Sequence, residues 1–167
     1  MRRLWAPWRL QYVQGAEEQT GCVFCDAAAG GDEERLVVHR GERAFVLLNK
    51  FPYASGHLMV APYTHTGRFG DLSGDEALEV HSLAAAALEV LAKSMHPQGY
   101  NLGWNLGRIA GAGVVDHVHL HVVPRWAGDT NFMPVLADVK VIPEALEDTR
   151  AKPRPSTYAV SPSISSP

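Results

Sequence analysis

The stretch DHVHLHVV, residues 116–123, places histidines at every second position of an otherwise apolar run. A period of two is typical of a β-strand, because successive side chains point to opposite faces of a sheet. His117, His119 and His121 are therefore expected on one face, with the residues between them on the other. We predict a strand over residues 114–124 that carries the chemistry of the protein.

Strand geometry limits what three such histidines can share. Residues two apart on one face lie ~6.5–7 Å apart, and residues four apart ~13 Å. Because a zinc–nitrogen bond is about 2.0–2.1 Å long, His117 and His121 cannot easily reach one ion. Two neighbouring histidines could share a metal, but one site for all three is not expected. Imidazoles that only fill a core are the alternative interpretation, and an apolar strand has no need of three.

The rest of the chain predicts an antiparallel sheet with helices on one side, which is an α+β fold. A capping box of Ser73 and Glu76 opens one long helix, which ends before Pro97. The stretch that begins at Cys22 leads into turns that end near Glu34. Besides the histidine strand, we expect strands at residues 35–40, 43–49, 57–62 and 100–107, an edge strand at 135–142, and a C-terminal helix at 143–151.

Length and composition indicate one globular domain. The chain has 167 residues, of which 46% are hydrophobic and 20% charged, and its net charge is −3. This charge gives no general attraction to nucleic acid or to anionic membranes, so any phosphate must be held by a local site. No apolar run approaches the ~20 residues of a spanning helix, and no signal peptide is recognised, so we expect a cytoplasmic protein. The expected organisation is an N-terminal arm at residues 1–21, one domain at 22–152, and a disordered tail at 153–167.

Cys22 and Cys25 form a C-x-x-C pair. Two thiolates at this spacing can hold one zinc ion, but a structural tetrahedron needs two more ligands. His65 and one end of the histidine strand, at His117, are the candidates. A redox pair would need a thioredoxin-like context that is not seen, and two ordinary buried cysteines are the other alternative. A zinc site is the favoured interpretation.

If His117 binds a metal, His119 and His121 are left for phosphate chemistry. A neutral imidazole, with an ordinary pKa near 6.5, is a nucleophile at physiological pH, and its adduct with phosphorus is labile. One ring nitrogen must face phosphorus while the other donates to a carbonyl that fixes the tautomer. Just upstream, the glycine-rich GRIAGAG offers backbone N–H groups for phosphate, including those of Gly111 and Gly113.

The run HVHLHVV resembles the histidine triad motif of a superfamily of nucleotide-binding proteins. The likeness extends to CVFC, AFVLLNKFPYASGHLMVAPYTH and GWNLG, in the expected order, and covers roughly residues 22–125. LWAPWR and PRWAGDTNFM resemble a narrower bacterial branch that includes diadenosine tetraphosphate phosphorylases. The resemblance implies a half-barrel-like antiparallel sheet with helices, and a homodimer whose sheets join.

The resemblance also implies a role for each histidine. His119 matches the nucleophile that attacks the α-phosphorus and carries the nucleoside monophosphate. His121 matches the histidine that contacts phosphate and the leaving group, and His57 matches one that lies behind the triad and orients it. The implied ligands of one structural zinc per chain are Cys22, Cys25, His65 and His117.

Substrate contacts follow from the same resemblance. Asn49 resembles a position that bonds the ribose hydroxyls, and Asn105 matches an asparagine near the transferred phosphate. Apolar walls around the base are implied at Phe45, Leu47 and Phe51. A Mg²⁺ ion that accompanies the substrate is left open as a second cofactor.

One departure concerns the leaving group. Many hydrolytic members carry Gly-Gln-Ser or Gly-Gln-Thr before the triad, whereas AGAGVVD, residues 110–116, offers neither and is one residue longer. Asp116, Asn105 or the backbone amides of residues 111–113 would then assist the leaving group. The missing glutamine also leaves room for inorganic phosphate as the acceptor.

We therefore predict an enzyme that transfers a nucleoside monophosphate through His119. The favoured substrate is diadenosine tetraphosphate or a related dinucleoside polyphosphate, cleaved by phosphorolysis or by hydrolysis. A purine nucleoside phosphoramidase would use the same intermediate with another leaving group. A nucleotide-binding sensor without turnover would use the same pocket. The predicted partners are an adenine nucleotide and a second copy of the chain, with no nucleic acid and no membrane.

Overall fold

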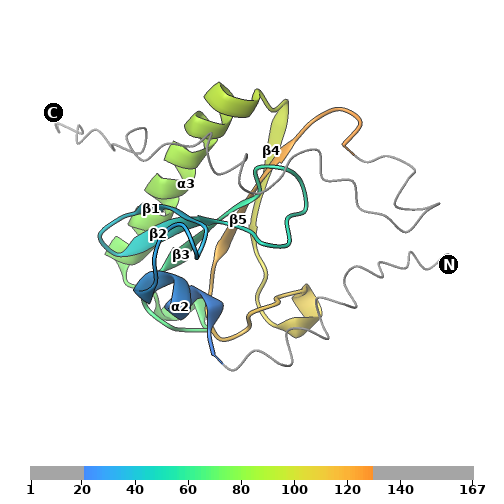
Figure 1. Cartoon of the computed structure of the whole chain (residues 1–167). Coiled ribbons are helices and arrows are strands. Elements are labelled where there is room, and N and C mark those ends of the chain that lie inside the picture. The colour runs from blue at the N-terminus through green and yellow to red at the C-terminus, as the bar shows by residue number, and fades with distance from the viewer. Residues whose placement is uncertain (1–20, 130–167) are drawn as a thin grey trace, which may run out of the picture.

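The computed structural model describes residues 21–129, which form an antiparallel sheet between two helices (Figure 1). The sheet order is β1-β2-β3-β5-β4, and every neighbouring pair is antiparallel. The predicted α+β class and the histidine-triad-like sheet are therefore confirmed. The strands are β1 Val37–Arg40, β2 Ala44–Leu48, β3 Leu58–Pro62, β4 Gly99–Trp104 and β5 Leu120–Arg125.

The long helix α3, Gly74–Met95, covers one face of the sheet and confirms the predicted helix (Figure 1). Its buried side chains recur at helical spacing, so that one stripe faces the strands. They pack against alternate residues of β2, β3 and β5, among them Leu120 and Val122 of the histidine run. The buried residues of the helix are Val80, Leu83, Ala84, Ala87, Val90 and Leu91.

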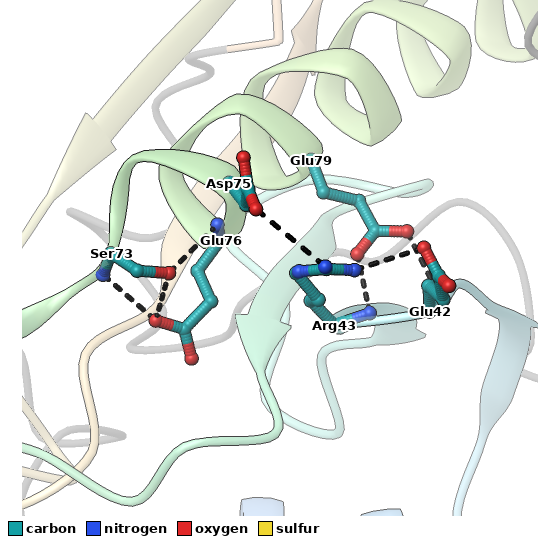
Figure 2. Close-up of polar contacts among 6 residues, drawn as sticks. All are labelled: Glu42, Arg43, Ser73, Asp75, Glu76 and Glu79. Atoms are coloured by element: carbon teal, nitrogen blue, oxygen red, sulfur yellow. Dashed lines mark hydrogen bonds and ion pairs between the residues drawn. The ribbon is translucent and has the colours of Figure 1, made fainter.

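Two carboxylates of α3 have structural roles: Glu76 caps the start of the helix, and Glu79 binds the connection between β1 and β2 (Figure 2). The predicted capping box is present: the Ser73 hydroxyl accepts from the Glu76 amide at 3.3 Å, and the Glu76 carboxylate accepts from the Ser73 amide at 2.8 Å. One turn later, the Glu79 carboxylate accepts from the backbone amides of Glu42, at 2.7 Å, and Arg43. These amides lie between β1 and β2, so Glu79 ties the helix to that connection.

A second helix, α2 Val23–Ala29, lies on the other face of the sheet and was not predicted. Its signal was the alanine run before the glycines at 30 and 31, which favours a helix with a defined end. Phe24 and Ala27 are buried against alternate residues of β2 and β3. The sheet is thus covered on both faces, and the prediction of helices on one side only is wrong.

Arg40 of β1 fastens the end of α2 to the sheet. Its Nη1 donates to the Ala28 carbonyl at 2.8 Å, and its Nη2 donates to the carbonyls of Ala27 and Gly30, each at 2.9 Å. Its Nε donates to the Asp32 carboxylate at 2.7 Å. Carbonyls at a helix C-terminus have no partner within the helix, so a forked cation there satisfies several of them at once.

The predicted histidine strand is wrong in its first half, because β5 begins at Leu120 and not at residue 114. The register pairs Val60 with Leu120, but pairing stops there. Pro62 of β3 has no N–H to donate to a further ladder bond. Its carbonyl accepts instead from Nε2 of His117 at 2.9 Å, which replaces strand pairing by a side-chain contact.

Several predicted segments lie outside the described residues. These are the N-terminal arm apart from Gly21, the edge strand at 135–142, the C-terminal helix at 143–151 and the tail at 153–167. Within residues 21–129, no helix has the length and apolar character needed to cross a membrane.

Arg40→Lys should lower the free energy of unfolding by about 1–3 kcal/mol, because a lysine cannot serve three carbonyls and a carboxylate together. Urea denaturation followed by circular dichroism measures the change. Arg68→Lys is the matched control, since the Arg68 side chain is 85% exposed in a 3.5 Å ion pair with Asp71, and it should change stability by less than about 0.5 kcal/mol. Equal losses in both variants would contradict the role of Arg40.

Candidate functional site

Four histidines gather on the face of the sheet that α2 covers. His57 precedes β3, His121 lies on β5, and His117 and His119 lie on the segment that leads into β5. All four are buried, with exposed fractions of 0% for His57 and His117, 5% for His119 and 9% for His121. Buried imidazoles need hydrogen-bond partners, so the contacts of each ring define the site.

The predicted metal ligands come together. One ligand atom from each of Cys22, Cys25, His65 and His117 lies within 4.8 Å of all the others. The Cys22 sulfur is 3.3 Å from Nδ1 of His117, and the Cys25 sulfur is 3.2 Å from Nδ1 of His65 and 3.7 Å from Nδ1 of His117. A tetrahedral zinc with ordinary bond lengths separates sulfur from nitrogen by about 3.6 Å. The donor set and its spacing therefore fit a four-coordinate metal.

Backbone contacts orient the two candidate histidine ligands, His117 and His65. Nε2 of His117 donates to the Pro62 carbonyl at 2.9 Å, so the lone pair of Nδ1 faces the sulfurs. His65 lies in the loop after β3, whose Thr66 carbonyl accepts from the Val118 amide at 2.8 Å. At Gly67 an added Cβ would lie 2.6 Å from the Val115 carbonyl oxygen, so only glycine lets the two segments approach this closely.

The ring of His119 is held in one tautomer by the main chain. Its Nδ1 lies 2.9 Å from the His117 carbonyl and must donate to it, which leaves the lone pair on Nε2. Burial lowers the pKa of His119, an effect that the hydrogen bond to the His117 carbonyl partly opposes. His119 therefore offers a neutral ring with an unprotonated Nε2, which is the form that attacks an electrophile.

A second chain of hydrogen bonds fixes the ring of His121. The Tyr53 amide donates to Nδ1 of His57 at 3.0 Å, so the proton of neutral His57 is on Nε2. This Nε2 lies 3.0 Å from Nδ1 of His121 and donates to it, which places the proton of neutral His121 on its own Nε2. Nδ2 of Asn105 lies 3.4 Å from that Nε2, and with the proton there the amide must turn its Oδ1 toward the ring to accept from it. His121 thus presents an N–H donor beside the lone pair of His119.

Burial, with a smaller contribution from His119, lowers the pKa of His121 to about 4. The ring of His121 packs against the ring of His119 with centroids 4.8 Å apart and an interplanar angle of 77°. Two neighbouring imidazoles in a buried site oppose each other's protonation. Both histidines are therefore neutral at physiological pH.

The approach of His57 depends on the glycine before it. Gly56 has φ +75°, and an added Cβ would lie 2.7 Å from the Met95 sulfur and 3.2 Å from a Leu91 methyl group. A larger residue would strain this backbone conformation and would require the Met95 side chain to move. The position of Gly56 sets where the chain enters β3, and hence where the His57 ring meets His121.

The two asparagines predicted to contact substrate lie beside the histidines, and the three predicted apolar residues differ in burial. Asn105 joins His121, and Asn49 lies 3.4 Å from Nδ1 of His57 while its Oδ1 accepts from the Phe51 amide at 2.8 Å. Phe45 and Leu47 are buried in the cluster around α2. The Phe51 side chain is 54% exposed.

The glycine-rich segment before the triad is folded into a short 3-10 turn, η2 Arg108–Ala110. The Gly111 amide donates to the Arg108 carbonyl at 2.9 Å, so it is already engaged. The Gly113 amide is in none of the backbone hydrogen bonds found between residues 21 and 129 outside helices and strands. Asp116 is exposed.

Two aromatic residues at the site were missed by the sequence analysis. The ring of Tyr53 stacks on His57 at 4.8 Å and also contacts His121, and the ring of Phe24 packs against His117 and His119. Phe24 lies between the two cysteines, and a single phenylalanine there has no periodic pattern to mark it. Tyr53 lies in the loop before His57, where its ring had no periodic pattern to mark it.

Comparison with known proteins decides the family. The model of the HIT domain matches residues 31–128. The chain belongs to the HIT domain family. The family predicted from the histidine run is therefore confirmed, and with it the prediction of a HIT-family enzyme.

Similar HIT proteins include both enzymes and a metal-bound structure. The chain is 39% identical over 158 residues to the AP-4-A phosphorylase of Mycobacterium tuberculosis strain H37Rv, covering 90% of this chain and 81% of that protein. It is 30% identical over 104 residues to the adenosine 5'-monophosphoramidase hnt1 of Schizosaccharomyces pombe, covering 62% and 74%. A Zn-bound histidine triad family protein from Mycobacterium smegmatis superposes with a TM-score of 0.65 at 25% identity, covering 87% and 96%.

The lowered pKa of His121 predicts a loss of stability in acid. The unfolded chain takes up a proton at the ordinary pKa of about 6.5, whereas the folded chain stays neutral at this ring until about 4. Between these values the unfolded state binds more protons, so the free energy of unfolding should fall as the pH falls.

Urea denaturation at about pH 7 and about pH 5 measures this slope. His121→Gln should make the slope shallower, because glutamine does not titrate. His81→Gln, at an exposed position of α3, should leave the slope as it is in the parent. Identical slopes in all three proteins would count against the assignment to His121.

Proposed function

We propose that this HIT protein transfers a nucleoside monophosphate from a dinucleoside polyphosphate, such as diadenosine tetraphosphate, through a covalent bond to His119. The observation that carries the proposal is the 2.9 Å hydrogen bond from Nδ1 of His119 to the His117 carbonyl. It leaves the Nε2 lone pair free in a buried neutral ring. The similarity to an AP-4-A phosphorylase over 90% of the chain supports the substrate class.

The reaction has two steps. Nε2 of His119 attacks the α-phosphorus, and the bond from phosphorus to the bridging oxygen breaks, which releases the nucleoside polyphosphate. The His119 ring becomes positively charged. Its Nδ1–H still donates to the His117 carbonyl, and this hydrogen bond stabilises the charge. Nε2–H of His121 donates to the phosphoryl oxygens, where negative charge gathers. An acceptor oxygen then attacks phosphorus and the neutral ring leaves.

We infer that the acceptor is inorganic phosphate. The run AGAGVVD lacks the glutamine and hydroxyl that accompany the triad in many hydrolytic relatives. The Gly111 amide is occupied by the Arg108 carbonyl, and Asp116 is exposed. Asn105, 3.4 Å from His121, is then the side chain best placed to bind the departing or the arriving group. Phosphate as acceptor gives a nucleoside diphosphate, whereas water gives a monophosphate.

We infer that Cys22, Cys25, His65 and His117 hold one structural zinc ion. The sulfur–nitrogen distances of 3.2–3.7 Å support it, as does the Zn-bound relative from Mycobacterium smegmatis. A closed Cys₂His₂ set leaves no open position for substrate. The ion would therefore hold α2, the loop after β3 and the histidine segment together. Any Mg²⁺ would travel with the substrate phosphates.

The partners that we infer are an adenine nucleotide and a second copy of the chain. β4 is one edge of the sheet formed by residues 21–129, and antiparallel strands can pair across a twofold axis. Pairing through β4 would place two sites in one assembly.

His119→Asn should abolish turnover while the protein stays folded and still binds nucleotide, because asparagine cannot form the covalent intermediate. With diadenosine tetraphosphate as substrate, intact-protein mass spectrometry should find one added AMP on the parent and none on the variant. His81→Asn, on the exposed face of α3, is the control and should behave as the parent does. Normal turnover by His119→Asn would refute the proposal.

The same assay, run with and without phosphate, tests the acceptor. ADP should appear only when phosphate is present. ADP formed at the same rate without phosphate would contradict phosphorolysis, and a nucleotide that stays intact throughout would favour a sensor. A nucleoside phosphoramidate as alternative substrate distinguishes the two activities, because a phosphoramidase would cleave it faster than the dinucleoside polyphosphate.

Removal of the metal should lower the melting temperature, since four ligands from three segments would lose their common partner. Metal analysis of the purified protein should find one zinc per chain, and a chelator followed by calorimetry measures the loss. Readdition of Zn²⁺ should restore the melting temperature. A metal-free protein of unchanged stability would contradict the zinc site.

A further inference from the structure

Phe24 connects the cluster of metal ligands with the proposed nucleophile. It lies between Cys22 and Cys25 in the first turn of α2, and its side chain is 1% exposed. Its ring centroid is 5.1 Å from that of His117 and 4.5 Å from that of His119, with interplanar angles of 47° and 35°. One apolar ring therefore packs against both a metal ligand and the nucleophile.

The remaining contacts of His119 show why such a ring matters. The hydrogen bond from Nδ1 to the His117 carbonyl fixes one atom of the imidazole. It does not by itself fix the ring plane, and the ring plane decides where Nε2 points. That plane is set by the neighbouring rings: His121 makes a T-shaped contact at 4.8 Å, and Phe24 makes the closer, more nearly parallel contact at 4.5 Å.

We propose that Phe24 is a positioning residue for His119, and that it couples the metal cluster to the nucleophile. The proposal rests on the proposed function of His119. The two cysteines that flank Phe24 would be held by the metal, which fixes the first turn of α2 and with it the Phe24 ring. The His117 side chain belongs to the same cluster while its carbonyl holds Nδ1 of His119. Both contacts that orient the nucleophile thus start from the metal ligands.

Phe24→Leu tests the positioning role, because leucine keeps most of the apolar volume but has no flat face. The rate of AMP transfer to His119 in a single turnover should fall by about tenfold to a hundredfold, as expected for a misdirected nucleophile. KM for diadenosine tetraphosphate should change little, and zinc content should stay at one per chain. Phe24→Ala should show a larger loss of rate.

Histidine ¹⁵N spectra give a readout that needs no substrate. At neutral pH, His119 of the parent should show a single tautomer with the proton on Nδ1. Phe24→Leu should show a mixture of the two neutral tautomers, because a ring that can rotate out of its plane weakens the hydrogen bond from Nδ1 to the His117 carbonyl. Val37→Ala is the matched control: Val37 is 1% exposed in the same apolar cluster as Phe24, so the variant loses stability by truncation of that cluster alone. Its His119 signals should match those of the parent.

Three outcomes would overturn the positioning role. One is a Phe24→Leu variant with the parent rate, the parent tautomer and only the stability loss of Val37→Ala, which would make Phe24 ordinary packing. Another is a raised KM at unchanged kcat, which would make Phe24 a substrate contact. The third is an unchanged tautomer together with a lowered rate.

The coupling to the metal is tested at His65, the exposed ligand. His65→Ala should lose zinc and shift the His119 signals in the same direction as Phe24→Leu does. Loss of zinc with unchanged His119 signals would overturn the coupling. If the parent forms no AMP adduct with any substrate, the proposed function fails, and the ¹⁵N comparison still decides the role of Phe24.

Discussion

The site depends on His117, a buried residue with three engaged groups. Its Nε2 donates to the Pro62 carbonyl, its Nδ1 faces the sulfurs of Cys22 and Cys25, and its own carbonyl accepts from His119. A buried imidazole with unsatisfied nitrogens would destabilise the fold, so these contacts help to keep the protein folded. The same contacts end the strand pairing, complete the candidate metal cluster and fix the tautomer of His119. A change in any one of them would disturb the other two.

Main-chain groups direct the chemistry of the other rings as well. The His117 carbonyl places the proton of His119 on Nδ1, and the Tyr53 amide places that of His57 on Nε2, which in turn orients His121. The first two choices depend on where the backbone lies, and the orientation of His121 depends on the ring of His57. The positions of the protons are thus a consequence of strand register and of the close packing of Gly56 against α3.

The sequence predicted those parts of the structure that repeat along the chain. The period of two placed Leu120 and Val122 in the core beneath α3, and the capping box placed the start of that helix. The predicted histidine strand began too early, because alternation alone cannot show that pairing with β3 stops before Pro62. The candidate metal ligands could be predicted from the C-x-x-C spacing and the resemblance, because few residue types bind zinc. Phe24 was not, because packing against two histidines is a tertiary contact that no local pattern encodes.

The electrostatics of the site bear on which leaving group it can serve. Because the pKa of His121 is lowered to about 4, its ring at neutral pH donates a hydrogen bond but is a poor source of a proton. A polyphosphate leaves as an anion that is stable in water and needs no proton from the enzyme. The amine of a phosphoramidate is a poor leaving group unless it is protonated as the bond breaks. A hydrogen-bond donor of low acid strength therefore favours the proposed cleavage of a dinucleoside polyphosphate over the cleavage of a phosphoramidate.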